Sequence, residues 1–121
     1  MNREIKFRAF DGVDYMTKPF TLLDIQNGKI QFASSDTKIM QFTGLKDKMG
    51  ADIYEGDIVI VTEPASNGMA EIVHNPVAVT WHEEIAGFNL GYVSNTMDIF
   101  YDYEIIGNVH QNPDILGIVQ E

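Results

Sequence analysis

Apolar and polar residues alternate with the two-residue period of β-strands along much of this chain. Residues 5–9 (IKFRA) alternate apolar and cationic side chains, and residues 58–62 (IVIVT) are β-branched throughout. Alternation of this kind indicates a strand with one buried face, and β-branched runs favour strands as well. We therefore predict a strand at each position, the second being the clearer of the two.

Turn-forming residues separate the other apolar runs. Asn27-Gly28 lies between residues 20–25 and residues 29–33, a pattern typical of a β-hairpin because both residues tolerate positive φ. Tight turns are predicted at residues 47–50 and 53–57. Five further strands are predicted, at residues 38–42, 71–74, 77–82, 88–93 and 103–110.

The end of the chain carries the signals for the few non-strand features. Gly107 inside the last predicted strand indicates a bulge or a close backbone approach. Asn112 and Pro113 fit the N-cap and first position of a short terminal helix. Residues 96–103 are the other candidate for a short helix, because their apolar residues recur at helical spacing.

Strands about every ten residues, with Gly, Pro and Asn between them, indicate a sandwich or a small barrel. The 121 residues fit one domain of ordinary size. We predict a mostly β fold in a single domain, residues 1–121. Residues 51–121 would form a small SH3-like antiparallel barrel, and residues 1–50 would add an N-terminal β-hairpin or sheet segment.

Charge is distributed unevenly along the chain. The net charge is −10, and all eight basic residues lie in the first 48 positions beside six acids. The other twelve acids therefore have no Lys or Arg among residues 49–121. This indicates a solvated acidic face, a surface for a basic partner, or one that imitates nucleic-acid phosphates. Direct nucleic-acid binding is disfavoured, because it depends on Lys and Arg neutralising phosphates.

Cysteine usage and the N-terminus bear on location. The chain has no cysteine, which removes disulfides, thiolate nucleophiles and zinc–thiolate sites and fits a reducing compartment. Residues 1–10 carry charges where a signal peptide would have its apolar segment. The longest apolar runs are far too short to cross a bilayer. We expect a soluble, cytoplasmic protein without membrane contact.

Residues able to do chemistry form no recognisable site. The histidines, His74, His82 and His110, lack the spacing of metal ligands, so no metal or other cofactor is predicted. Glu55 and Asp57 could share a strand face and do acid–base work, but the sequence around Gly56 favours a structural corner. There, Asp57 would accept backbone N–H groups while Gly56 adopts an unusual φ. No catalytic residue is assigned.

Aromatic residues are the better binding candidates. Trp81 shares a predicted strand face with Val77 and Val79, which favours a place in the core. The remaining aromatic residues cannot all be interior in so small a domain, so some would line a groove or an interface. Aromatic side chains beside acids favour a cationic peptide or protein. The candidate binding surface comprises Tyr54, Glu55, Asp57, Tyr92, Asp98, Tyr101, Asp102 and Glu104.

Three stretches of the chain resemble the YopX family of phage and prophage proteins. They are residues 3–11 (REIKFRAFD), residues 40–50 (MQFTGLKDKMG) running on to residues 53–59 (IYEGDIV), and residues 103–113 (YEIIGNVHQNP). Phe10 stands where the family often has Trp, and Met49 replaces the more usual Asn before a glycine. Taken together, the three motifs are specific.

The resemblance implies a mostly β protein with no established biochemical activity and no agreed active site to carry over. Three hypotheses for function remain. The first is a non-enzymatic phage or prophage accessory protein that contacts a host or phage protein with a basic surface. The second is a homo-oligomer that uses long edge strands, such as residues 58–62, and the opposite charges of the two segments. The third is a cryptic carboxylate-based hydrolase or nucleotide-processing enzyme.

Overall fold

The computed structural model describes residues 4–32, 36–65, 68, 70–90 and 101–119, and it is mostly β, as predicted. The strands are β1 (Phe7–Phe10), β2 (Lys38–Lys46), β3 (Asp52–Tyr54), β4 (Asp57–Glu63), β5 (Ile72–Val73), β6 (Val77–Ala78), β7 (Thr80–His82), β8 (Gly87–Asn89) and β9 (Asp102–Asn108). The helices are α1 (Leu22–Gln26) and α2 (Asp114–Val119), with a 3₁₀ turn at Glu83–Ile85.

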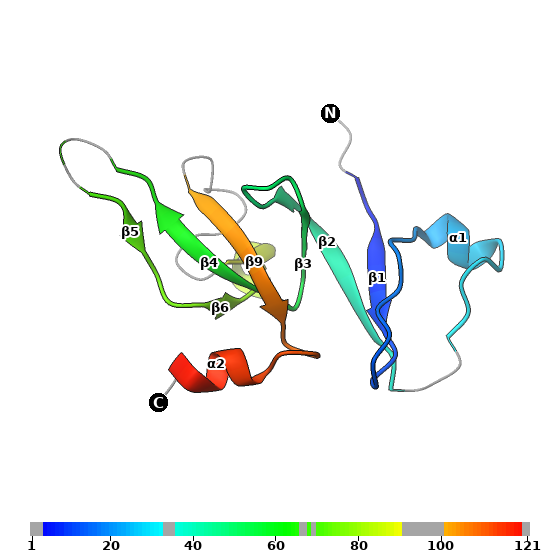
Figure 1. The fold of residues 1–121 in the computed structure, drawn as a ribbon. Coiled ribbons are helices and arrows are strands. Elements are labelled where there is room, and N and C mark those ends of the chain that lie inside the picture. Colours follow the sequence, from blue (N-terminus) through cyan, green and yellow to red (C-terminus); the bar gives the residue numbers. More distant parts are fainter. Residues whose placement is uncertain (1–3, 33–35, 66–67, 69, 91–100, 120–121) are drawn as a thin grey trace.

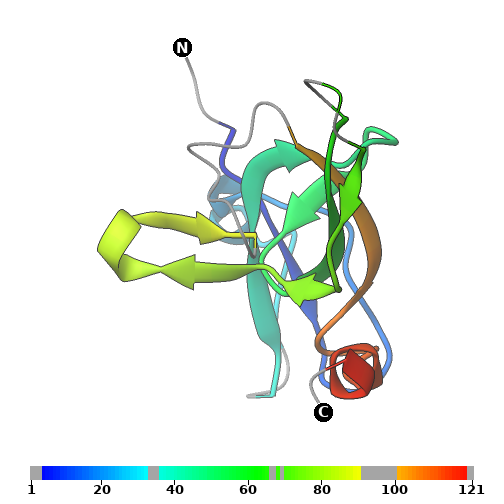
Figure 2. The ribbon, with the colours of Figure 1, turned by 90° about the vertical axis from the view of Figure 1, so that its left-hand side faces the viewer.

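In the part of the chain that the structure describes, all strand pairs are antiparallel and form three groups. An N-terminal sheet has the order β1-β2-β3, and a second sheet is built around β4. The short strands β5 and β6 occupy one edge of β4, and β9 occupies the other. Strands β7 and β8 form a separate ribbon that stands out from the body of the molecule (Figure 2). Among the described residues these pairings do not close into a barrel.

Two hydrophobic cores meet at β3, because its neighbouring residues point in opposite directions. Tyr54 joins the smaller cluster, which also contains Phe10, Met40 and Phe42. Ile53 belongs to the larger cluster. The other buried members of the larger cluster are Val59, Val61, Val79, Phe88, Leu90 and Tyr103.

The predicted hairpin at residues 20–33 is wrong, because residues 22–26 form helix α1 (Figure 1). Thr21 caps the helix: its hydroxyl accepts from the N–H of Asp24, whose carboxylate accepts from the N–H of Thr21. This reciprocal capping box starts a helix. The Asn27-Gly28 pair ends that helix, with Asn27 as C-cap and Gly28 at φ +74°.

The expectation that residues 58–62 form an edge strand is also wrong. The strand exists as β4, but it lies in the centre of its sheet between β9 and the pair β5 and β6. Ile58, Val59 and Val61 are completely buried. Continuous β-branched runs are typical of such central strands, whereas edge strands carry charges.

Trp81 is half exposed, with 46% of its surface open to solvent, so its predicted place in the core is wrong. The predicted strand at residues 77–82 divides at Val79, which donates its N–H to Asp57 and accepts from Gly56. Strand β6 pairs with β4, while β7 pairs with β8. The change of partner separates Trp81 from the face occupied by Val79.

The last strand and the terminal helix follow the prediction. The pairing of β4 with β9 shifts register beside Gly107, which is the predicted bulge. A Cβ on Gly107 would lie 2.7 Å from Oδ1 of Asn112, so the backbone approach there is also close. Helix α2 begins at Asp114, one residue later than predicted; the Asn112 side chain accepts from the N–H of Asn108, and the Asn112 C=O accepts from the N–H of Ile115. The helix predicted at residues 96–103 lies largely outside the described residues.

Within the described part of the chain, neither helix is long and apolar enough to span a membrane.

Candidate functional site

Four cations from the first 48 residues pair with acids that follow residue 51. Lys6 and Lys46 both bind Asp52, at 2.7 and 2.6 Å. Lys48 lies 3.5 Å from Glu104, and Arg8 pairs with Asp57. The two oppositely charged segments of the sequence therefore recognise each other within one chain.

The Arg8–Asp57 pair is the most deeply buried of these contacts. Asp57 is 1% exposed; one carboxylate oxygen binds Arg8, and the other accepts from the N–H of Tyr54 at 2.8 Å. Gly56 beside it has φ +89°. This confirms the structural corner predicted at these residues. Burial raises the pKa of the Asp57 carboxyl, and the positive charge of Arg8 opposes that rise.

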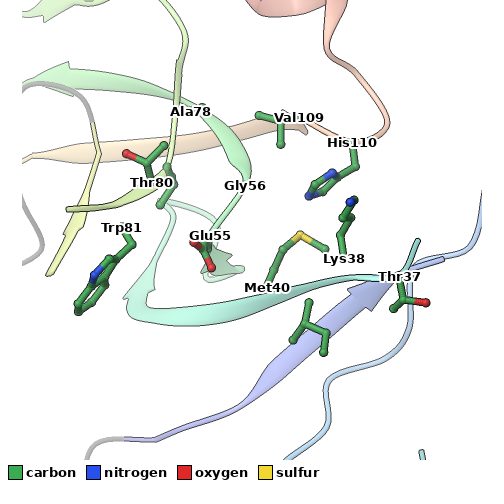
Figure 3. Close-up of a pocket in the computed structure, with 12 residues that line it drawn as sticks. Thr37, Lys38, Met40, Glu55, Gly56, Ala78, Thr80, Trp81, Val109 and His110 are labelled. Carbon is green, nitrogen blue, oxygen red and sulfur yellow. The ribbon is translucent and has the colours of Figure 1, made fainter. Parts of the chain in front are cut away.

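A pocket of about 520 Å³ opens between the start of β2 and the junction of β6 with β7 (Figure 3). It is the candidate functional site, because it combines an apolar floor with several polar groups from different elements. Its lining residues are Thr37, Lys38, Ile39, Met40, Glu55, Gly56, Ala78, Val79, Thr80, Trp81, Val109 and His110.

The pocket has chemically different ends. Figure 3 shows Lys38 and His110 together at one end, Trp81 at the other, and Glu55 between them. His110 stacks on the ring of Phe10, with centroids 5.9 Å apart. Burial, together with the charges of Lys38 and Arg8, lowers the pKa of His110 below its usual 6.5. His110 is therefore mainly neutral at pH 7.

Gly56 keeps the floor of the pocket open. A Cβ at this position would lie 3.3 Å from the Met40 sulfur and 3.6 Å from Nε2 of His110. The positive φ of Gly56 already disfavours any other residue. The tight β3–β4 corner therefore brings Glu55 to the pocket without filling the space beside it.

Glu55 and Trp81 are the groups in the pocket whose chemistry suits a cation. Within the described residues the Glu55 carboxylate makes no hydrogen bond or ion pair. Trp81 contacts Phe88 edge-on, with ring centroids 5.2 Å apart and an interplanar angle of 78°. That contact holds the indole in place and leaves nearly half of its surface open.

The structure does not gather the predicted binding residues into one surface. Glu55 lines the pocket, but Tyr54 and Asp57 are buried and do not line it. Tyr101 packs against the larger core, while Asp102 is exposed on β9 and Glu104 reaches Lys48. The remaining two, Tyr92 and Asp98, lie outside the described residues. Glu55 and Asp57 do not both face the pocket, so they do not form a carboxylate pair there.

Sequence reasoning missed most of the pocket. The sequence places Lys38 and Met40 in a predicted strand and Trp81 in the core, and it gives His110 no role as a metal ligand. They come from segments some 30 to 70 residues apart, and no local pattern records that they meet. In the described part of the chain, no group of three or more His, Asp or Glu side chains could hold a metal ion.

Comparison with known proteins gives a family and a fold. The sequence model of the YopX family, described as YopX protein, matches residues 17–117. The crystal structure of protein EF1440 from Enterococcus faecalis superposes with a TM-score of 0.56 at 22% identity. The match covers 95% of this chain and 99% of that one, and at this identity it shows a shared fold. No curated protein matches.

Proposed function

Because the chain belongs to the YopX family, we propose that it is a non-enzymatic accessory protein of a phage or prophage that binds a basic segment of a partner protein. The segment would be held in the pocket between β2 and β7, with an Arg or Lys side chain against Trp81 and Glu55. The observation that carries this proposal is the pairing of a half-exposed indole with an unpartnered carboxylate in one pocket.

The chemistry of those two groups selects a cation. A guanidinium or ammonium group is attracted to the face of an indole, with a contribution of about 0.5–2 kcal/mol. A hydrogen bond to a charged carboxylate adds about 1.5–3 kcal/mol. The net charge of −10 attracts basic partners and repels acidic ones over longer distances.

Internal ion pairs narrow the choice of partner. Lys6, Lys46 and Arg8 are already bound to acids of the same chain. The acids that these pairs leave unneutralised, Glu55 among them, remain available to another protein. Charge attraction between copies of this chain is correspondingly weaker than the sequence alone implies, so a partner with its own basic residues fits the pocket better.

The experiment uses the single tryptophan of the chain as its reporter. The peptide acetyl-SVRVS-amide is titrated into the protein at low salt while the fluorescence of Trp81 is recorded. We expect saturable binding that weakens at least tenfold when the peptide Arg is replaced by Gln, because Glu55 and Trp81 then have no cation to bind. Equal binding of the two peptides, or no binding of either, would overturn the proposal.

A matched pair of variants locates the contact. Glu55→Gln should weaken binding of the Arg peptide about tenfold, because it removes the charge in the pocket. Glu84→Gln is the control, since the Glu84 side chain is 89% exposed on the β7–β8 ribbon and does not line the pocket. It makes the same change in net charge, so a similar loss in both variants would indicate general attraction and not this site.

A further inference from the structure

The edge of β2 that borders the pocket carries backbone groups that the fold leaves unused. Strand β1 pairs with the other edge of β2, with Ala9 opposite Ile39. Ala9 directs its polar groups away from β2: its N–H donates to the Thr17 hydroxyl at 3.0 Å, and its C=O accepts from the Thr17 N–H at 2.9 Å. Ala9 and Ile39 are therefore a non-hydrogen-bonded pair, and the N–H and C=O of Ile39 point away from β1.

On the pocket side, β2 loses its partner before it reaches Ile39. The β3–β4 turn reaches β2 through Glu55, whose N–H donates to the Gln41 C=O at 2.9 Å. Ile39 lies two residues before Gln41, so its polar groups point to the same edge. Among the described residues nothing bonds to them there, and Ile39 lines the pocket.

We propose that this open edge of β2 receives the basic segment as an added β-strand. The inference rests on the proposed function and specifies how the segment binds. One residue of the segment would exchange two backbone hydrogen bonds with Ile39. The side chains on one face of the segment would then lie over Met40 and reach Trp81 and Glu55, since strand side chains alternate.

Features around Ile39 favour binding of one short extended peptide over edge-to-edge pairing with another sheet. The open stretch is short, because Glu55 occupies the edge at Gln41. Lys38 at the start of β2 is exposed and carries a charge, which discourages pairing between two copies of this edge. Main-chain hydrogen bonds would supply affinity without sequence preference, and Trp81 and Glu55 would select the basic side chain.

The test uses five versions of acetyl-SVRVS-amide, each with one backbone nitrogen methylated. A strand directs alternate N–H groups to the same edge. We therefore expect methylation of the residue opposite Ile39 to weaken binding at least tenfold, because its N–H would donate to the Ile39 C=O. Methylation of its two neighbours, whose N–H groups face away from β2, should weaken binding by less than threefold. Binding is followed by Trp81 fluorescence and by slower hydrogen exchange of the Ile39 amide in NMR.

The outcomes separate this inference from the proposed function. If all five peptides bind as well as the parent, the pocket holds the Arg side chain and strand addition is overturned, while the proposed function stands. If the unmethylated parent does not bind, both fail. A loss on methylation of one residue but not of its two neighbours, together with protection of Ile39, supports strand addition.

A pair of protein variants gives an independent readout. Ile39→Pro removes the N–H that faces the pocket, and proline is tolerated on strand edges. Ile39→Ala keeps that N–H and serves as the control for the lost side chain. We expect at least a tenfold loss of peptide affinity for Ile39→Pro and less than threefold for Ile39→Ala. Equal affinities of the two variants, both folded by NMR, would overturn the proposal.

Discussion

The N-terminal layer (β1, α1 and β2) leaves many of its large apolar residues exposed, whereas the sheet around β4 buries most of its own. Among the described residues, nine of the twelve exposed large apolar side chains lie in the first 49 positions, and three lie beyond them. Helix α1 has no buried residue at all. The buried residues of the larger core, by contrast, all come from Ile53 onward.

The difference shows that the two regions are stabilised by different interactions. The sheet around β4 buries enough apolar surface to be held by the hydrophobic effect. The N-terminal layer has the smaller cluster and depends more on bonds to its neighbour, through the β2–β3 pairing and the ion pairs of Lys6 and Arg8. Four predictions test this comparison, from the largest expected effect to the smallest.

The Arg8–Asp57 pair should make the largest contribution. Arg8→Met leaves the Asp57 carboxylate buried without its cation, which typically costs about 3–5 kcal/mol in the free energy of unfolding. Urea denaturation of the variant and the parent protein measures that cost. The double variant Arg8→Met/Asp57→Asn should recover a large part of it, because no buried charge remains unpaired. A single-variant loss below about 1 kcal/mol would show that the pair does not hold the layers together.

Two leucines compare the regions directly. Leu90 is completely buried in the larger core, whereas Leu23 on α1 is 61% exposed. We expect Leu90→Ala to reduce the free energy of unfolding by about 2–5 kcal/mol. Leu23→Ala, the same substitution, should change it by no more than about 0.5 kcal/mol. Similar losses for the two variants would mean that α1 is packed in solution.

Asp47 ties the β2–β3 turn to β9, and its contribution should depend on pH. It accepts from the N–H groups of Met49 and Ala51 at 2.9 Å and of Ile105 at 3.3 Å. Burial alone would raise its pKa, but these backbone hydrogen bonds lower it below the usual 3.8. An acid with a lowered pKa stabilises the fold above its ordinary pKa and loses that contribution as pH falls through the folded value.

Asp47→Asn should therefore be less stable than the parent protein by roughly 1 kcal/mol at pH 7. The gap should narrow as pH falls below about 4, because the parent's carboxylate becomes protonated there. Urea denaturation at pH 7 and pH 3 measures both differences. A gap that stays constant over this range would show that the hydrogen bonds do not depend on the charge.

The Lys48–Glu104 pair should contribute least. Both side chains are about half exposed and 3.5 Å apart, so Lys48→Met should cost no more than about 1 kcal/mol. The cost should disappear at 1 M salt, where exposed charges are screened. Thermal denaturation at low and high salt measures it, and a large loss independent of salt would identify a packing role for the lysine stem.

Local patterns in the sequence determined much of the sheet framework and the corner at Asp57. Strands β1, β2, β4 and β9 lie at predicted positions, because the alternation of their side chains already specifies one buried face. The β3–β4 turn was predictable for a local reason: Gly56 lacks a Cβ and tolerates a positive φ, and the Asp57 carboxylate accepts a hydrogen bond from a nearby backbone N–H. The family was also recognisable from three short motifs.

Only the tertiary structure decided where Trp81 points and that β4 is central, because each depends on which distant segment a strand meets. Helix α1, by contrast, begins at a local capping box between Thr21 and Asp24, and this local signal prevails over the hairpin that Asn27-Gly28 indicates. The pocket is the extreme case, since Ile39, Glu55 and Trp81 meet there from three elements. A sequence pattern indicates which face of a strand is apolar, but long-range packing decides which segment pairs with its edge. Here the β3–β4 turn pairs with β2 only as far as Gln41, so the backbone of Ile39 has no partner there among the described residues.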